Sequence, residues 1–390
     1  RMACDETGLG RYEDKILKNK LTIEKTPGPE VLIPRAESGD SGLMLEEYAP
    51  YGLIGAVTPT TNPTETIINN TISMLSGGNG VVYNVHPSAK NCCAYAVKLI
   101  NSAIIEAGGP SNLITMVKEP TMDTVKVISS SPKVRMMVGT GGMGLVKALL
   151  SSGKKTIGAG AGNPPVVIDE TADIKYAAEK VFAGASFDNN LLCLAEKEVF
   201  IVNKVADEFI RNMQMNGAYL LSDTELEKVT AYCMTKDSSG WHVNKRAVGK
   251  NAGDILEGAG IHGQKDCRLA IASTCKDHPF VQVEQLMPVL PIVKCSDVDE
   301  AIEWAKEAEH GNRHTASMFS QNINNLTRFA REIETTIFVK NSFTLAGVGY
   351  EGEGFSTMTI AGPTGEGLTC AKSFTRQRRC VLGDGGFSIV

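Results

Sequence analysis

Short apolar runs alternate with helical patterns between Leu53 and Ile168, and this alternation restricts the possible folds more than any other feature of the sequence. Such an order is typical of β–α–β units, whose strands form a parallel sheet. The predicted strands cover 53–58, 80–85, 112–117, 134–138, 156–158 and 165–168. The predicted helices cover 64–75, 88–106, 121–130 and 142–151, and several begin at a Ser, Thr or Pro that suits a first turn. This part is predicted to be a Rossmann-like α/β domain.

A second α/β series follows and predicts a second domain of similar size. Its predicted helices cover 174–186, 204–216, 298–309 and 323–333, and its predicted strands cover 198–202, 269–272, 289–293, 316–319 and 337–340. The glycine-rich segment 347–367 suits either a loop that approaches a ligand or a linker. Segments 20–48 and 380–390 have extended patterns outside both cores, so we expect them to be arms that reach another subunit.

Composition excludes several classes of function. The chain has 390 residues, 42% of them hydrophobic, and a net charge of -5, which disfavours nucleic-acid or membrane-surface binding. There is no run of about 18 apolar residues to cross a bilayer and no secretory signal. Ten scattered cysteines without a Cys-x-x-Cys pair indicate reduced thiols, a cytoplasmic location and no metal site. The start at Arg1 suggests that an N-terminal segment is missing.

The stretch 139–144 reads Gly-Thr-Gly-Gly-Met-Gly and matches Gly-x-Gly-x-x-Gly between a predicted strand and a predicted helix. The backbone N–H groups of Thr140, Gly141 and Gly142 could therefore face a phosphate. The acidic residue expected about twenty residues further on is absent. A tight strand-to-helix turn without a ligand is the alternative.

Cys193 lies in a loop between a predicted helix and a predicted strand, after the polar run Phe-Asp-Asn-Asn. A loop cysteine is expected to be more exposed than a core cysteine, and nearby backbone dipoles would favour its thiolate, which is the reactive form. We therefore predict that Cys193 is a nucleophile. The other nine cysteines are taken as small buried hydrophobic residues.

Three further motifs accompany this loop, in a fixed order along the chain. The stretch 50–63 contains Thr-Pro-Thr-Thr-Asn-Pro, the stretch 82–87 reads Val-Tyr-Asn-Val-His-Pro, and the stretch 284–289 reads Glu-Gln-Leu-Met-Pro-Val. Together they resemble the aldehyde dehydrogenase superfamily over nearly the whole chain. The resemblance implies that Asn62 contacts the substrate oxygen and that Glu284 holds the nicotinamide ribose. The superfamily's usual Lys after the second strand is replaced by His86.

The same resemblance implies a cofactor site for NAD in the first domain. Its expected binding residues are Thr58, Pro59, His86, Pro87, Thr140, Gly141, Gly142, Ala161, Gly162, Glu284 and Pro288. Because the acidic residue after the glycine motif is absent, selectivity between NAD and NADP stays open. The expected domains are a nucleotide-binding domain at 1–162 with its arm at 20–49, a catalytic domain at 163–368 and an oligomerisation arm at 369–390.

Within the superfamily, the motifs resemble the CoA-acylating propionaldehyde and acetaldehyde dehydrogenases of bacterial microcompartments. Hydrolytic members carry Glu-Leu-Gly-Gly, whose Glu activates water, whereas this chain has Ala-Gly-Ala-Gly at 159–162. General-base help to water is worth about 10²–10⁴-fold, so its loss favours the thiol of coenzyme A as acyl acceptor. His314 resembles a His near the active Cys and is a candidate base for that thiol, although a structural role is the alternative.

The resulting hypothesis is a reversible ping-pong reaction of a short-chain aldehyde, NAD and coenzyme A that gives acyl-CoA and NADH. Lys147, Lys154 and Lys155 could supply charge for the CoA phosphates or could simply be solvated. The Arg cluster at 376–379 favours subunit contacts over CoA. We expect a homodimer or homotetramer, with a missing N-terminal extension that binds a microcompartment shell. The rival hypotheses are a hydrolytic enzyme, a non-catalytic scaffold and a thiolase-like transferase.

Overall fold

The computed structural model describes residues 1–385 and divides into two units, each formed by separate stretches of sequence. One unit, called here the seven-strand unit, comprises Arg1–Lys18 and Gly160–Gly354. The other, the five-strand unit, comprises Asn19–Ala159 and the chain from Phe355 onward. The domains predicted from the sequence were continuous ranges (1–162, 163–368 and 369–390). They differ from the two units because residues 1–18 group with 160–354, and the chain from Phe355 onward groups with 19–159. The roles assigned to those ranges stay predictions.

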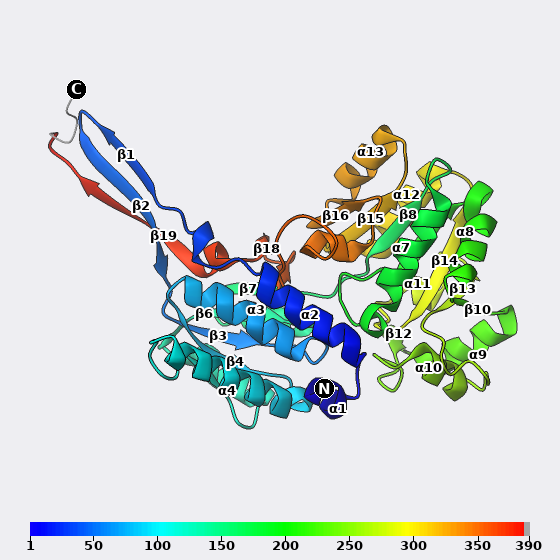
Figure 1. Ribbon diagram of the computed structural model, residues 1–390, viewed down its shortest axis with the longest axis horizontal. Coiled ribbons are helices and arrows are strands. Elements are labelled where there is room, and N and C mark those ends of the chain that lie inside the picture. Colours follow the sequence, from blue (N-terminus) through cyan, green and yellow to red (C-terminus); the bar gives the residue numbers. More distant parts are fainter. Residues whose placement is uncertain (386–390) are drawn as a thin grey trace. The chain divides into compact units, whose positions relative to one another are not determined.

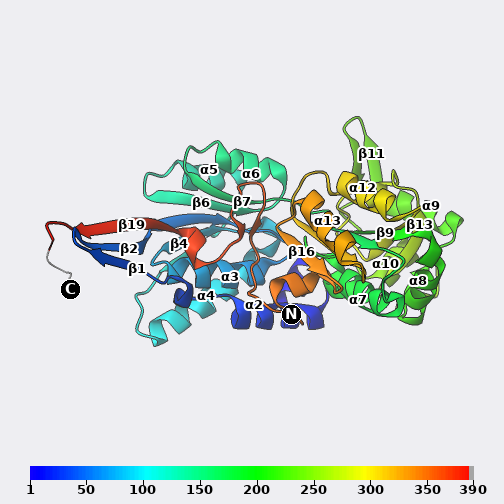
Figure 2. The same cartoon turned by 90° about the horizontal axis from the view of Figure 1, so that it is seen from above.

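The five-strand unit is built on a parallel sheet with the strand order β5-β4-β3-β6-β7. Helices α3 and α4 cover one face, and α5 and α6 cover the other (Figure 2). Its strands are β3 (Leu53–Val57), β4 (Gly80–Asn84), β5 (Ile114–Met116), β6 (Val134–Thr140) and β7 (Lys155–Ala159). Its helices are α3 (Pro63–Ser76), α4 (Lys90–Glu106), α5 (Met122–Ser130) and α6 (Met143–Leu150). The predicted Rossmann-like order is confirmed for these elements.

A three-stranded antiparallel sheet extends from this unit (Figure 1). It consists of β1 (Arg35–Gly39), β2 (Gly42–Pro50) and β19 (Thr375–Leu382), and β2 pairs with β19 along eight residues. The predicted extended conformation is thus seen from residue 35, whereas the role of these segments as arms that reach another subunit stays a prediction, and residues 386–390 lie outside the described part of the chain. The expectation for residues 20–25 was wrong, because they continue the helix α2 (Tyr12–Lys25).

The seven-strand unit has an all-parallel sheet with the order β10-β13-β14-β9-β8-β15-β16. Its strands are β8 (Pro165–Ile168), β9 (Glu198–Val202), β10 (Tyr219–Leu220), β13 (Ala270–Thr274), β14 (Val289–Cys295), β15 (Thr315–Phe319) and β16 (Ile337–Lys340). Its helices are α1 (Met2–Thr7), α7 (Ile174–Ser186), α8 (Asn203–Met215), α9 (Asp223–Cys233), α10 (Ala252–Gly258), α11 (Pro279–Gln282), α12 (Val298–Glu309) and α13 (Ile323–Ile333). The sequence grouped strand 165–168 with the first series, but β8 belongs to this sheet.

Alternating side chains of the central strands place one core on each face of this sheet. Val166 and Ile168 pack with α7 and α8, whereas Val167 between them packs with α12 and α13. The two-residue period of a strand explains why such a strand is apolar throughout. Helices close both cores, so both faces of the sheet are covered. No helix within residues 1–385 is long and apolar enough to span a membrane.

Short connecting elements complete the described chain. They are the hairpin β11 (Met234–Asp237) and β12 (Gly240–Val243), the pair β17 (Ile360–Ala361) and β18 (Gly367–Leu368), and the 3-10 turns η1 (Pro29–Val31), η2 (Pro87–Ala89), η3 (Phe187–Asn190), η4 (Thr344–Val348) and η5 (Ala371–Phe374). The glycine-rich segment 347–367 contains the change from one unit to the other after Gly354. This position favours the linker interpretation of that segment.

Candidate active site

The amino-terminal edge of the seven-stranded sheet brings the predicted catalytic segments together. Neighbouring strands β14, β9, β8 and β15 are parallel, so the residues that precede each strand lie along one edge. These residues are Glu284 before β14, Cys193 before β9, Gly162 before β8 and His314 before β15. Residues more than 150 positions apart in sequence therefore meet at this edge.

Gly162 lies at the centre of this group. A Cβ atom added to Gly162 would lie 2.6 Å from the Cys193 carbonyl oxygen and 2.9 Å from Cγ of His314. The Gly162 N–H donates a hydrogen bond of 3.3 Å to Oε1 of Glu284. Only glycine allows this close approach, and the structure thus joins Cys193, His314 and Glu284 through one residue.

We expect the Gly162→Ala variant to lower kcat by about 10²-fold, because the added methyl group must displace the Cys193 loop or the His314 ring. Steady-state kinetics on the purified variant measure this effect. The Gly39→Ala variant is the matched control, since a Cβ at Gly39 meets no atom of the described residues within 4 Å. A Gly162→Ala enzyme with unchanged kcat would show that the close approach is not needed.

The turn that leads to Cys193 has an unusual backbone. Asp188, Asn189 and Asn190 have positive φ angles of 46°, 54° and 60°, in the left-handed region. This conformation costs about 1–2 kcal/mol per residue for most side chains, and Asp and Asn adopt it more readily than others. Three such residues in succession turn the chain sharply after α7 and direct it toward Cys193.

Side-chain hydrogen bonds hold this turn. The Asn189 amide donates to the Gly249 carbonyl at 2.9 Å, and the Asn190 amide donates to the carbonyls of Ala185 and Glu196 at 2.9 and 2.8 Å. All three side chains of the turn are buried. Their polar atoms stabilise a backbone conformation that would otherwise be unfavourable, so the position of Cys193 is fixed.

Lys197, which follows Cys193 in the sequence, forms hydrogen bonds with two residues that precede it. Its buried ammonium group donates to the Asn190 carbonyl at 2.9 Å, to the Asn190 side-chain oxygen and to the Leu192 carbonyl at 3.1 Å. Burial lowers the pKa of Lys197 to about 8, although Glu284 and Cys193 act in the opposite direction. Lys197 can therefore stay charged at neutral pH and supplies positive charge close to the thiol.

The resting state of Cys193 differs from the sequence-based expectation. Its thiol is partly buried, and burial together with the nearby Glu284 carboxylate raises the pKa of Cys193 to about 12. Lys197 and Lys18 lower it by less. Partial burial in this resting structure thus opposes the thiolate that the loop was expected to favour, and the role of Cys193 as nucleophile stays a prediction. Deprotonation must therefore accompany reaction.

His314 is buried and uncharged at neutral pH. It is 2% exposed, and burial, followed by Lys197, lowers the pKa of His314 to about 4. Its backbone N–H donates to Glu309 at 3.0 Å, and its Nδ1 lies 2.9 Å from Oγ1 of Thr315. Within residues 1–385, the buried Nε2 atom has no hydrogen-bond partner. Such an atom is suited to bind or accept a proton from a ligand, which is consistent with the predicted role as a base.

The free energy of unfolding should depend on pH through His314. Between pH 6.5 and about 4, the unfolded chain binds a proton that the folded chain does not, so acid destabilises the fold. We expect the wild type to lose about 2 kcal/mol more than His314→Gln between pH 7 and pH 5, measured by urea unfolding. Subtraction of the pH profile of His314→Gln from that of the wild type removes the contributions of the other titratable groups to the free energy of unfolding. Parallel pH profiles would contradict a buried neutral His314.

The carboxyl edge of the five-stranded sheet carries the predicted nucleotide-binding residues. In a sheet of this order, ligands bind where the strand order reverses, here between β3 and β6. Thr58 and Pro59 follow β3, and Thr140 ends β6 ahead of Gly141. Within the described chain, the buried hydroxyls of Thr58 and Thr60 have no hydrogen-bond partner. These orphaned donors fit a polar ligand such as a nucleotide.

The glycine motif and His86 lie at the same edge. Gly142 is the N-cap of α6, is exposed, and has open space where a Cβ would be. His86 and Pro87 follow β4, and Nδ1 of His86 accepts a hydrogen bond from the Ser88 N–H at 3.2 Å. This arrangement leaves room for a phosphate at α6 and fits the predicted site, whose residues stay predictions.

Asn62 belongs to the same unit and begins α3. It is the N-cap residue, is buried, and its carbonyl accepts a hydrogen bond of 2.6 Å from the Thr66 hydroxyl. Its amide lies 3.3 Å from the Thr61 hydroxyl. The structure thus fixes the Asn62 backbone at the end of the loop that follows β3, and its contact with the substrate oxygen stays a prediction.

Two of the lysines considered for CoA have structural partners. Lys154 donates to the carbonyls of Ser131 and Val134 at 2.8 and 2.6 Å, and Lys155 pairs with Glu366 at 2.6 Å. Both ammonium groups therefore have partners in the five-strand unit, which disfavours the CoA interpretation for Lys154 and Lys155. In the arginine cluster, Arg379 pairs with Glu46 across β2 and β19.

Sequence reasoning missed Lys197 and the role of the Asp-Asn-Asn turn. A signal was present in both cases. Three consecutive residues that tolerate positive φ directly precede the nucleophile, and a Glu-Lys-Glu run stands at 196–198 before an apolar strand. Charged residues at the entry to a buried strand are expected to be paired or functional.

The geometry defines a class of protein before any comparison. A partly buried thiol and a neutral imidazole at one sheet edge, with a nucleotide-type sheet in the second unit, are typical of enzymes that form a covalent acyl intermediate. Residues 23–358 match the model of the aldehyde dehydrogenase family. The chain belongs to this family.

Several characterised relatives are similar to the chain over almost its full length. A CoA-propanoylating propanal dehydrogenase of Salmonella typhimurium is 48% identical over 388 residues, which cover 99% of this chain and 82% of the relative. An acetylating acetaldehyde dehydrogenase of Bilophila wadsworthia is also 48% identical, over 100% of this chain and 82% of the relative.

Solved structures agree with these relatives. The propionaldehyde dehydrogenase of Rhodopseudomonas palustris with bound propionyl-CoA superposes with a TM-score of 0.95 at 51% identity, covering 98% of this chain and 84% of that one. A second structure of that enzyme contains CoA and an acylated cysteine. A propionaldehyde dehydrogenase from the fucose-utilisation microcompartment of Clostridium phytofermentans has a TM-score of 0.96 at 48% identity, covering 99% and 88%. The α/β fold predicted from the sequence is confirmed.

Proposed function

We propose that the protein is a CoA-acylating aldehyde dehydrogenase, which converts a short-chain aldehyde, NAD and coenzyme A into acyl-CoA and NADH. The observation that carries this proposal is the Gly162 cluster, in which the Cys193 loop lies at one sheet edge with Nε2 of His314, an atom that has no hydrogen-bond partner among residues 1–385. Relatives named for the same reaction, with propionyl-CoA and an acylated cysteine bound, support it.

The first half of the proposed reaction forms a bond between the Cys193 sulfur and the aldehyde carbon, and the proton of the thiol is released to solvent. The oxyanion accepts hydrogen bonds from the Cys193 N–H and the Asn62 amide, each worth about 3–4 kcal/mol to the transition state when well placed. NAD, when bound, accepts the hydride. Lys197 contributes positive charge beside the sulfur, and the burial of the cluster keeps water away from the thioester.

The second half transfers the acyl group to coenzyme A. The CoA sulfur attacks the Cys193 thioester, its proton passes to Nε2 of His314, and Cys193 leaves as a thiolate. His314 is suited to this step because it is neutral at physiological pH and its Nε2 is not used within the described structure. CoA follows NADH at the nucleotide site, which gives ping-pong kinetics.

Hydrolysis to a free acid is the second candidate function, and Glu284 is the observation that favours it. The segment 159–162 has no carboxylate, but the Glu284 carboxylate lies within hydrogen-bond distance of Gly162. Burial raises the pKa of Glu284, which makes its carboxylate a stronger base than an exposed one. The Gly162 N–H and Lys197 lower this pKa by less than burial raises it, and both stabilise the charged carboxylate. This favours a binding role for Glu284 over that of a base.

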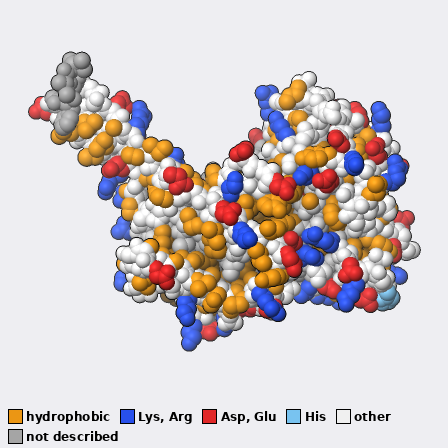
Figure 3. Space-filling view, viewed as in Figure 1, with side chains coloured by type: hydrophobic (Ala, Val, Ile, Leu, Met, Phe, Trp, Pro, Cys, Tyr) orange, Lys and Arg blue, Asp and Glu red, His pale blue; other side chains and the backbone are white. Residues whose placement is uncertain are grey.

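We propose a homodimer or homotetramer with the three-stranded arm at the subunit contact. The arm exposes Val381 and Leu382, which are 61% and 50% exposed, and hydrophobic side chains lie along it in Figure 3. Similarity to a microcompartment enzyme supports a cytoplasmic location inside such a shell. Sedimentation analysis of wild type and Val381→Lys tests the oligomeric state.

The function is tested by incubating the enzyme with NAD, CoA and aldehydes of two to six carbons. We expect NADH and the matching acyl-CoA in equal amounts, with the highest kcat/KM for acetaldehyde or propionaldehyde. Each methylene should change kcat/KM by about 10–200-fold at most. NADP in place of NAD establishes the nucleotide preference. A product that is a free acid, whatever the CoA concentration, would contradict the proposal.

A further inference from the structure

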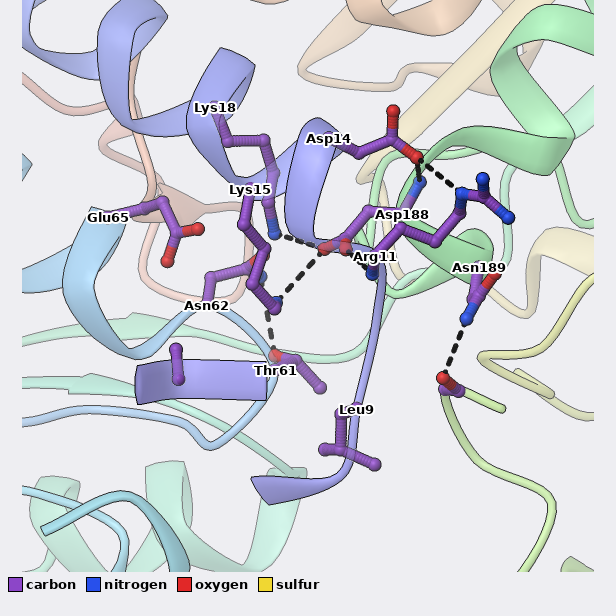
Figure 4. Close-up of polar contacts among 12 residues, drawn as sticks. Leu9, Arg11, Asp14, Lys15, Lys18, Thr61, Asn62, Glu65, Asp188 and Asn189 are labelled. Atoms are coloured by element: carbon purple, nitrogen blue, oxygen red, sulfur yellow. Dashed lines mark hydrogen bonds and ion pairs between the residues drawn. The ribbon is translucent and has the colours of Figure 1, made fainter. Parts of the chain in front are cut away.

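Asp188, the first residue of the left-handed turn, is the centre of a buried ionic cluster that the reaction does not use. Its carboxylate is fully buried and accepts hydrogen bonds from the Arg11 N–H at 2.8 Å and from Lys15 at 3.2 Å. Lys18, which is 1% exposed, forms a further ion pair with the same carboxylate. Figure 4 shows these donors from the start of the chain pointing toward Asp188.

The contact is reciprocal. The Asp188 N–H donates at 2.9 Å to the carboxylate of Asp14, and Arg268 lies 3.5 Å from that carboxylate. Gly10 lies so close that an added Cβ would be 2.2 Å from Oδ1 of Asp188. The segment 10–18 is therefore fitted to the Asp188 carboxylate in both charge and shape.

The cluster continues into the turn beside the nucleophile. The Gly249 carbonyl accepts hydrogen bonds from both the Gly10 N–H and the Asn189 amide, each at 2.9 Å. The next residue, Asn190, is bonded to Lys197, which also binds the Leu192 carbonyl. A continuous set of contacts thus leads from α2 through Asp188 to the residue before Cys193.

We propose that Asp188 is a positioning residue, anchored by Lys15, Lys18 and the Arg11 N–H, that holds the left-handed turn and thereby places Cys193 for attack on the aldehyde. The start of the chain acts as a clamp on the catalytic loop, and substrate binding does not involve it. The inference rests on the proposed function of Cys193, but its test includes a measurement that needs no substrate.

The first test compares Asp188→Asn with wild type. We expect kcat to fall about 10–100-fold and KM for the aldehyde to change by less than about threefold, because misplacing a reacting group slows chemistry more than binding. Alkylation of Cys193 by iodoacetamide, followed by peptide mass spectrometry, should become about tenfold faster, because a relaxed turn exposes the sulfur to water.

The matched control for a lost buried carboxylate is Asp169→Asn. Asp169 is also fully buried and accepts hydrogen bonds from Thr171, Ser320 and Asn325, but it follows β8 at the opposite edge of the sheet. We expect Asp169→Asn to keep kcat and Cys193 alkylation within about twofold of wild type. The buried Cys233 and Cys295 report general unfolding in every variant.

The Gly10→Ala variant keeps all charges and disturbs only the fit of segment 10–18 to the Asp188 carboxylate. It replaces Asp188→Asn as the test if that variant does not fold. Gly8→Ala is its control, since Gly8 also has a positive φ of 65° but, among the described residues, a Cβ there approaches only Lys250. Gly10→Ala should reproduce the kcat loss and the selective alkylation of Cys193, and Gly8→Ala should not. Unchanged kcat in folded Asp188→Asn or Gly10→Ala, or alkylation of Cys233 and Cys295 to the same extent as Cys193, would overturn the inference. A wild type that makes no acyl-CoA would refute the proposed function alone, because the alkylation contrast would remain.

Discussion

Replacement of Cys193 by Ala should reduce acyl-CoA formation by about 10⁴-fold or more, since the sulfur forms the bond through which both half-reactions proceed. Without it, no thioester can form, and hydride transfer from the hydrated aldehyde has no covalent assistance. NADH absorbance measures the loss. Intact-mass analysis after incubation with aldehyde and NAD should show an acyl adduct on the wild type and none on Cys193→Ala.

The matched control is Cys275→Ala, because Cys275 is an exposed thiol of the same unit that lies between β13 and α11. It should retain full activity and its adduct. The result that contradicts the assignment is NADH production by Cys193→Ala at more than about a hundredth of the wild-type rate. In that case another thiol or a direct hydride mechanism would have to replace Cys193.

Omission of CoA should stop turnover after about one NADH per active site, because the remaining acceptor, water, has no efficient base. Hydrolysis should be about 10²–10⁴-fold slower than transfer to CoA. Rapid-mixing absorbance resolves the initial burst from the slow phase. Addition of CoA should then release the acyl group as acyl-CoA and restore turnover.

A CoA analogue without sulfur is the control for binding alone, and it should not restore turnover. Glu284→Gln separates the two candidate acceptors, since this variant keeps the size of the side chain near Gly162 but removes its basicity. If water is the natural acceptor, the enzyme will turn over at full speed without CoA and Glu284→Gln will lose that rate. If CoA is the acceptor, the slow phase will be similar in both proteins.

The parallel sheets could be predicted because their strands are continuous apolar runs between helices with clear first turns. Strands 53–58 and 80–85 correspond to β3 and β4 within one residue at the carboxyl end. The division into units could not, because it depends on where the first 18 residues and the end of the chain pack. Strand β8 was described in series with the first sheet, although the predicted boundary at 162/163 placed it in the second domain, because apolar runs do not specify their neighbours.

Several residues of the candidate site could be predicted from the sequence, but their electrostatics could not. Cys193, His314 and Glu284 could be named from motifs, and the sheet places each before a strand at one edge. The electrostatics could not be predicted, because the raised pKa of Cys193 and the lowered pKa of His314 both arise from burial in three dimensions. Lys197 was missed because a lysine beside two glutamates normally indicates a solvated face.

The candidate active site lies at the amino-terminal edge of the seven-stranded sheet. The carboxyl edge is therefore available for the attachment of a label. The loops after β8 and β15 are braced by Asp169, Thr171 and Ser320, and Gln321 at their surface is exposed. A fluorophore or a short peptide tag attached at Gln321 should therefore follow the enzyme in a cell extract without slowing catalysis.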